Sequence, residues 1–239
     1  NDLYLDLNGY TVTGSFTMGS NTLYGMDSSS KEYVAPSGKI VGRVSNYAKT
    51  YETSPVNETY DRYVAISGTE ADDKTSNLSF HHFNISVSGY RFELTSGDTP
   101  KCALFFIGKF RGDDVAKDRL KKLSFTLTGE NGADPKEGSC TLPQALDNEV
   151  FSDTDGAYLF EFYLMRSFGK DASAASFTES IHATAKATFQ NQSDLGEQVS
   201  KERSLSFKEA WENADNLTSA QREIINKILK EHGINPQTE

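Results

Sequence analysis

A long alternation of apolar and polar residues from position 77 to position 94 constrains the fold of this chain more than any other feature. Alternating side chains point to opposite faces of a β-strand. Ser88-Gly89 interrupts the pattern, which indicates a kink or bulge before Tyr90, Phe92 and Leu94 continue it. The two predicted faces carry Leu78, Phe80 and His82 on one side and His81, Phe83, Ile85 and Val87 on the other.

Further apolar segments follow at regular spacing, with polar turns and almost no helix between them. They are Cys102–Phe110, Leu123–Thr128, Tyr158–Ser167, Ser180–Phe189 and Val199–Leu205. A series of this kind favours a mainly β fold built as an antiparallel β-sandwich of jelly-roll type. Tyr158–Met165 is apolar on both faces, which indicates a central strand.

The first 45 residues have a different pattern. Short apolar strands at Tyr10–Thr13, Ser15–Met18, Thr22–Met26 and Lys39–Val44 alternate with turns rich in Gly or Ser. This predicts short coils of a parallel β-helix, although an antiparallel meander fits the same pattern. We expect Leu5 and Leu7 to pack against the sandwich. Asp6 and Asp27 are interpreted as solvated turn residues rather than as a catalytic pair.

Two stretches of this leader carry a family resemblance. Leu5-Asp6-Leu7-Asn8-Gly9-Tyr10-Thr11-Val12-Thr13-Gly14 resembles the opening coil of pectin-lyase-like surface proteins, and Leu23–Ser29 with Gly38–Gly42 resembles their next coil. The resemblance covers residues 3–44 and implies an architecture without implying an activity.

The following segments resemble a module of secreted proteins from Gram-positive gut bacteria. The residues concerned are Ser79–Ile85, Gly108–Asp114 and Leu123–Leu127. The resemblance implies an extracellular location on the bacterial cell surface, with further domains of the same chain on both sides. The chain begins without Met inside a strand pattern, so we expect it to be a piece of a longer protein whose secretion signal lies upstream.

The C-terminal region is predicted to be helical. Ser206 and Thr218 each begin a capping-box pattern, Ile225 and Leu229 belong to an apolar stripe, and Gly233 ends the helix. Lys227 and Lys230 are expected to face water. We therefore divide the chain into coils (1–45), a connection with one strand at Tyr63–Ser67 (46–77), a sandwich (78–205) and a C-terminal helical segment (206–234).

The charge of the chain argues against two classes of partner. Its net charge is −10 and its isoelectric point is near 5.0, so it repels nucleic-acid backbones and anionic lipid surfaces. The only basic runs are short, such as Lys121-Lys122. No apolar stretch approaches the roughly 18 residues of a membrane helix, so membrane insertion is not expected. Cys102 and Cys140 leave two alternatives open, a disulfide bridge or buried free thiols.

The sequence lacks the common catalytic and zinc-binding motifs, such as Gly-x-Ser-x-Gly and His-Glu-x-x-His. Asp153-Thr154-Asp155-Gly156 begins like a calcium loop, but position 12 is Leu164 instead of Glu, and a hairpin turn is the alternative. Asp153 and Asp155 are thus candidate calcium ligands, and no other cofactor is expected. Arg111-Gly112-Asp113 is the tripeptide that integrins read at exposed loop tips, or simply the end of a strand.

These features predict a non-catalytic cell-surface module that binds or presents a ligand. Tyr47, Tyr51, Tyr60 and Tyr63 are expected to be exposed and to stack on sugar rings. The expected partners are a host glycan or a host protein, immunoglobulin included. The alternative is a fragment of a polysaccharide-active enzyme whose site lies outside this chain.

Overall fold

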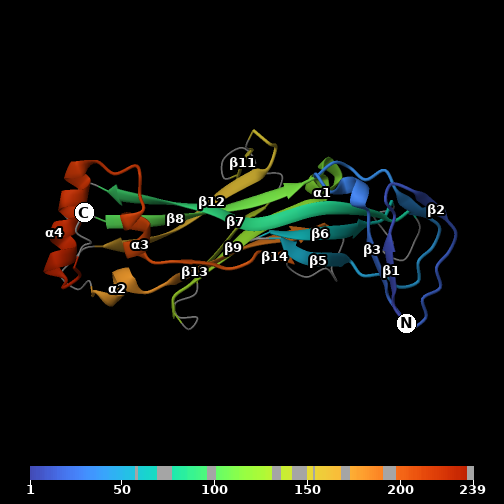
Figure 1. The fold of residues 1–239 in the computed structure, drawn as a ribbon, viewed down its shortest axis with the longest axis horizontal. Coiled ribbons are helices and arrows are strands. Elements are labelled where there is room, and N and C mark those ends of the chain that lie inside the picture. Colours follow the sequence, from blue (N-terminus) through green and yellow to red (C-terminus); the bar gives the residue numbers. More distant parts are fainter. Residues whose placement is uncertain are drawn as a thin grey trace.

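The computed structural model describes residues 1–56, 59–68, 77–95, 101–130, 136–141, 150–152, 154–167, 173–190 and 198–235. Of residues 54–56, 59–60, 139–141 and 150–152 it describes the backbone alone. The chain is mainly β, as predicted, and its two large sheets are antiparallel. Figure 1 shows an elongated molecule, with the N-terminal strands at one end and the C-terminal helices at the other.

The larger sheet has six strands within the described residues. In spatial order they are β11 (Val150–Ser152), β12 (Tyr158–Ser167), β8 (Lys101–Gly112), β7 (Ser79–Thr95), β6 (Thr59–Ile66) and β5 (Thr50–Val56). The long strand β7 has the expected irregularity, a register shift between Val87 and Gly89. Segment 46–77, expected to connect two units through one strand, instead supplies the two strands β5 and β6 of this sheet.

The second sheet has five strands in the described part of the chain. They are β10 (Lys136–Thr141), β9 (Leu120–Thr128), β13 (Ile181–Phe189) and β14 (Gln198–Val199), with β15 (Arg203–Leu205) pairing further along β13. Helix α1 (Asp114–Arg119) joins β8 to β9, and α2 (Ala175–Thr178) precedes β13.

The two large sheets share an apolar core. Phe83 and Phe110 of the six-stranded sheet contact Phe189 of the five-stranded sheet, and Phe125 stacks on Phe162 with ring centroids 4.4 Å apart. Burial of each such side chain contributes about 1.5–3 kcal/mol. The sheets therefore lie face to face.

The apolar side chains of β7 lie on two opposite faces, as predicted, and the two faces contribute to two different cores. Phe83, Ile85 and Val87 face the core between the large sheets. Leu78 and Phe80 face a second core beneath the N-terminal strands. Strand β7 is therefore shared by both halves of the molecule.

The N-terminal strands pair in parallel. β1 (Leu3–Asp6) pairs with β3 (Leu23–Met26), and β2 (Thr11–Thr13) pairs with β4 (Lys39–Val41), while η1 (Ser28–Ser30) forms the turn between β3 and β4. Leu7 is buried, as expected, but Leu5 is only partly buried. The backbone N–H of Ile40 donates to the Leu78 carbonyl over 2.8 Å, which joins this layer to the start of β7.

Asp27 corrects the expectation of a solvated turn residue, because its side chain is fully buried. Its carboxylate accepts hydrogen bonds from the backbone N–H groups of Gly9 (2.9 Å), Ser29 (2.9 Å) and Gly38 (2.8 Å). Charge-assisted hydrogen bonds of this kind are about twice as strong as neutral ones. Asp27 therefore holds three turns together in a buried position.

The C-terminal helices α3 (Phe207–Glu212) and α4 (Ser219–Glu231) begin at the two predicted capping boxes. Ile225 and Leu229 are buried against the main core, and Lys227 and Lys230 are exposed, as predicted. Gly233 follows the helix with φ of 75°. In the described part of the chain, no helix has both the length and the apolar character needed to cross a membrane.

Candidate anion-binding pocket

Two basic side chains project from the outer face of β8. The residues before them alternate, so that Leu104, Phe106 and Phe110 enter the core while Lys109 and Arg111 point the other way. In the antiparallel register, Ser86 of β7 lies opposite Lys109 and Asn84 lies opposite Arg111. The outer face of β7 and β8 therefore combines two cations with a hydroxyl and an amide.

A second basic pair lies on the segment that leads into β15. Strand β6 pairs with β7 only as far as Phe83, so the next residues of β7 have no β6 neighbour. The Arg62 guanidinium of β6 donates a hydrogen bond to the Val199 carbonyl over 2.8 Å, which ties β6 to β14 of the second sheet. Lys201 and Arg203 are thereby brought beside β7.

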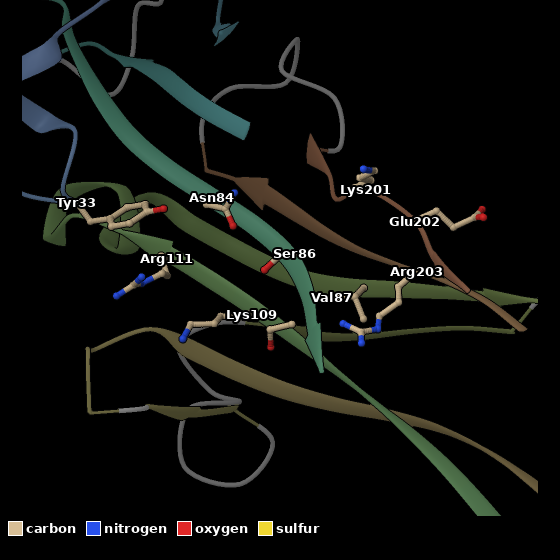
Figure 2. Close-up of a pocket in the computed structure, with 10 residues that line it drawn as sticks. Tyr33, Asn84, Ser86, Val87, Lys109, Arg111, Lys201, Glu202 and Arg203 are labelled. Atoms are coloured by element: carbon tan, nitrogen blue, oxygen red, sulfur yellow. The ribbon is translucent and has the colours of Figure 1, made fainter. Parts of the chain in front are cut away.

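These two pairs line one pocket of about 300 Å³, at the lower end of the range for small-molecule sites. Figure 2 shows Arg111 and Lys109 on one side of β7 and Arg203 on the other, with Ser86 between them. Four of the ten lining residues are Lys or Arg, and Glu202 is the one acidic residue among them. Glu202 points away in the same view and lies 2.8 Å from Nδ1 of His182.

Tyr33 forms one wall of the pocket in an unusual backbone conformation, with φ of 61°. A bulky residue in the left-handed region is a genuine outlier that costs on the order of 1–3 kcal/mol, and such outliers cluster at functional sites. The Arg111 guanidinium lies 5.0 Å from the Tyr33 ring centroid. The Tyr33 ring also stacks on the His82 ring, with the two centroids 4.4 Å apart.

His82 links the pocket wall to the N-terminal core. Its ring lies between Tyr33 and Tyr63, and Nε2 is 3.3 Å from a carboxylate oxygen of Asp61. Burial lowers the pKa of His82, because the charged ring is poorly solvated there, while Asp61 opposes this effect. The stack is therefore built around a histidine that favours its neutral form.

A second cavity of about 230 Å³ shares Tyr33 and Arg111 with the first but has mixed charge, since Asp114, Lys117 and Asp155 also line it. The Arg111 guanidinium lies 3.2 Å from Asp155, in an ion pair whose side chains are 36% and 60% exposed. An exposed pair of this kind contributes at most about 1 kcal/mol. Arg111 can therefore exchange this partner for a ligand at little cost.

The described residues do not test whether Asp153 and Asp155 bind calcium. Asp153 lies outside the described residues, and Asp155 has the guanidinium of Arg111 as its neighbour. Among the residues that the structure describes, no three His, Cys, Asp or Glu side chains gather as a metal site. A calcium role for Asp153 and Asp155 stays a prediction.

The expected exposure of two tyrosines is wrong. Tyr63 is fully buried, its relative exposure being 0%, and this burial raises its pKa to about 12; Tyr47 is also buried, in the N-terminal core. Tyr51 is partly exposed, and the side chain of Tyr60 lies outside the described residues. Tyr51 belongs to an aromatic cluster in which the exposed Tyr4 stacks on Tyr24 at 5.0 Å and both rings contact Tyr51.

A Ser-His-Asp contact that sequence motifs did not indicate lies at the start of β7. Nε2 of His81 is 2.7 Å from the Ser79 hydroxyl, and Nδ1 is 2.9 Å from each carboxylate oxygen of Asp113. Asp113 is buried and also accepts from the Ala116 N–H as the N-cap of α1. The contact ties β7 to α1, and the burial of Asp113 removes it from the reach of an integrin.

Cys102 is a buried free thiol on β8. Burial raises its pKa to about 12, which keeps the sulfur protonated and unreactive. The side chain of Cys140 lies outside the described residues.

The four basic residues of the pocket do not form a run along the sequence. Lys109 and Arg111 are two residues apart within β8, which places both on one face of that strand, whereas Lys201 precedes β15 and only Arg203 belongs to it. The Lys109-x-Arg111 spacing is the signal from which a basic strand face could be predicted. Comparison of the chain with models of known protein families, with curated proteins and with solved structures gave no significant match.

Proposed function

We propose that this chain is a non-catalytic module of a bacterial cell-surface protein and that it binds a glycan outside the cell. The basic pocket beside β7 carries the proposal. It combines an aromatic wall, hydroxyl and amide groups and several cations in a concave site, which is the mixture that orients a polar ligand.

The architecture supports a role in presentation. Under this proposal the parallel N-terminal pairs are rudimentary β-helix coils, and the two large sheets form a jelly-roll type sandwich. The N-terminal strands and the C-terminal helices lie at opposite ends of the long axis (Figure 1). A module of this shape suits a place in line between other domains, with its sheet face directed sideways towards a ligand.

A glycan and host-protein array probed with the purified chain tests the proposal. The double variant Arg111→Ala and Arg203→Ala should lose the signal of the wild-type chain, because these residues line both sides of the pocket. If only host proteins such as immunoglobulin give a signal on the array, the ligand is a protein and the glycan proposal is wrong. Turnover of any glycan by this chain would contradict the non-catalytic role and favour a polysaccharide-active enzyme.

The Ser79–His81–Asp113 contact supports a second candidate function, hydrolysis through a serine nucleophile. In that case His81 would accept the Ser79 proton, and Asp113 would hold the imidazole in the required orientation. The hydroxyl of Ser79 also donates to the Ile66 carbonyl over 3.4 Å, and neither cavity described above is lined by Ser79. A fluorophosphonate probe tests the candidate, because labelling that disappears in Ser79→Ala would establish a reactive serine.

A further inference from the structure

We infer that the ligand of the pocket beside β7 is an acidic glycan, whose carboxylate or sulfate groups are held by the two basic pairs Lys109/Arg111 and Lys201/Arg203. The inference rests on the proposed function, because it names the chemical class of glycan for that same site. Its basis is the placement of these four cations around one pocket of an acidic protein.

The charge of the lining is opposite to that of the chain. The whole sequence has 34 acidic residues against 24 Lys and Arg, yet the lining of this pocket has four basic side chains and one acidic side chain. A concave site lined by one sign of charge concentrates ligands of the opposite sign. A neutral sugar can only accept ordinary hydrogen bonds from these groups, whereas the carboxylate of a uronate or the sulfate of a sulfated sugar adds attraction between opposite charges.

The spacing of the cations favours a chain with repeated acidic groups over a single small anion. Lys109 and Arg111 are two residues apart on one strand, so their Cα atoms are separated by about 7 Å. Lys201 and Arg203 lie across β7 from them. A ligand that crosses β7 therefore meets a cation near each end of the pocket.

The remaining lining fits a sugar ring better than a bare anion. Ser86 and Ser88 of β7 supply hydroxyl groups to the lining, beside the buried Asn84. Tyr33 presents a partly exposed aromatic ring at one wall and is held in a strained conformation between His82 and Arg111. The serine hydroxyls can pair with the hydroxyls of a saccharide.

Nucleic acid shares the anionic character but fits the molecule less well. The affinity of a protein for nucleic acid comes from many phosphate contacts along a basic surface. This chain has a net charge of −10, and the four cations of the pocket are a local exception to it. We therefore keep a single-stranded oligonucleotide as a competitor in the test.

Titration of the purified chain with four probes tests the inference: a hyaluronan hexasaccharide, a chondroitin sulfate hexasaccharide, neutral chitohexaose and an oligothymidylate. We expect the two acidic saccharides to bind at least about tenfold more tightly than chitohexaose, and more weakly as salt is added. Both acidic saccharides carry uronate carboxylates, so tighter binding of chondroitin sulfate would indicate an added contribution from sulfate, and equal binding would indicate carboxylate recognition. Tighter binding of the oligothymidylate would overturn the inference.

Matched variants locate the effect. Lys109→Gln with Arg203→Gln removes one cation from each pair and should weaken acidic saccharide binding by about tenfold or more. The exposed residue Lys201 offers Lys201→Gln as a second variant that does not disturb packing, with a smaller loss in the same direction. Lys121→Gln with Lys136→Gln changes the net charge equally at exposed sites of the other sheet and should leave affinity unchanged.

The outcomes separate this inference from the proposed function. If chitohexaose binds as tightly as the acidic saccharides, the acidic class is wrong while glycan binding stands. If both pocket variants bind acidic saccharides like the wild-type chain, the assignment of the ligand to this pocket is wrong. If no saccharide binds here or on the array, the proposed glycan function falls with it. If the control variant loses as much affinity as the pocket variant, net charge explains the binding and the assignment to this pocket is wrong.

Discussion

Gly25 of β3 lies against the ring of Phe80, and the substitution Gly25→Ala tests whether the N-terminal strands fold as one unit with the large sheets. An added methyl carbon would lie under 3.0 Å from Cζ, Cε1 and Cε2 of Phe80. Phe80 is buried on β7, in the second core, so its ring has little room to move. Overpacking of this kind costs about 1–3 kcal/mol.

The unfolded chain offsets part of this cost, because replacing Gly by Ala reduces its conformational freedom by about 0.4–1 kcal/mol. The middle of the two ranges gives a net loss of about 1.3 kcal/mol in the free energy of unfolding, which lowers the melting temperature by about 3–5 °C in a chain of this size. Urea unfolding monitored by circular dichroism measures it.

A matched control and a double-mutant cycle identify the cause. Gly89→Ala on β7 places its methyl carbon 3.6 Å from Ile107, an ordinary contact, and should leave stability unchanged or slightly raised. Phe80→Leu replaces the ring that meets residue 25 with a shorter side chain. The loss of stability in the double variant should therefore be smaller than the sum of the losses in the two single variants. Unchanged stability in Gly25→Ala would refute this packing and leave the N-terminal strands as a separate or frayed element.

Three further predictions concern other buried groups. Ile225→Ala on α4 should lower the free energy of unfolding by about 2–4 kcal/mol, and a loss below about 0.5 kcal/mol in urea unfolding would mean that the helix is not packed on the sheets. In the variant Cys140→Ser, the Cys102 thiol of the folded protein should resist iodoacetamide, because a pKa of about 12 instead of 9 leaves about a thousandfold less thiolate. Labelling of the folded protein as fast as that of the urea-unfolded protein would contradict this. Burial lowers the pKa of His82, so as pH falls below the ordinary histidine pKa of 6.5 the unfolded state binds a proton before the folded state does, and stability should decline. The variant His82→Phe should flatten this decline in melting temperature, while the control His232→Gln should retain it. Equal slopes in the two variants would be evidence against the buried neutral ring.

Local pattern predicted much of the secondary structure of this chain. Tyr158–Ser167 is a strand with the predicted bounds, and the alternation along β7 assigned Phe80 and Phe83 to opposite faces, where two different cores now lie. The helix starts at Ser206 and Thr218 could likewise be predicted from the local sequence. Strand alternation and helix caps depend on residues a few positions apart, so the sequence contains all the information that they need.

Burial of individual polar residues could not be predicted in this way. Asp27, Tyr63 and His81 stand in ordinary turn or strand patterns, yet all three are buried because other segments cover them. Alternation tells which face of a strand a side chain occupies, but not what packs on that face. For this reason Tyr63 was expected at the surface and Asp27 in water.

The sequence by itself determined the mainly β architecture, the two faces of β7 and the C-terminal helices. The tertiary structure alone decided the candidate site, because Lys109/Arg111 and Lys201/Arg203 belong to segments far apart in the chain. They meet because β14 and β15 pair with β13 in the second sheet, which packs against β7. The physical reason is that strand periodicity is a local property, whereas the convergence of charges depends on which strands pair and on how the two sheets pack together.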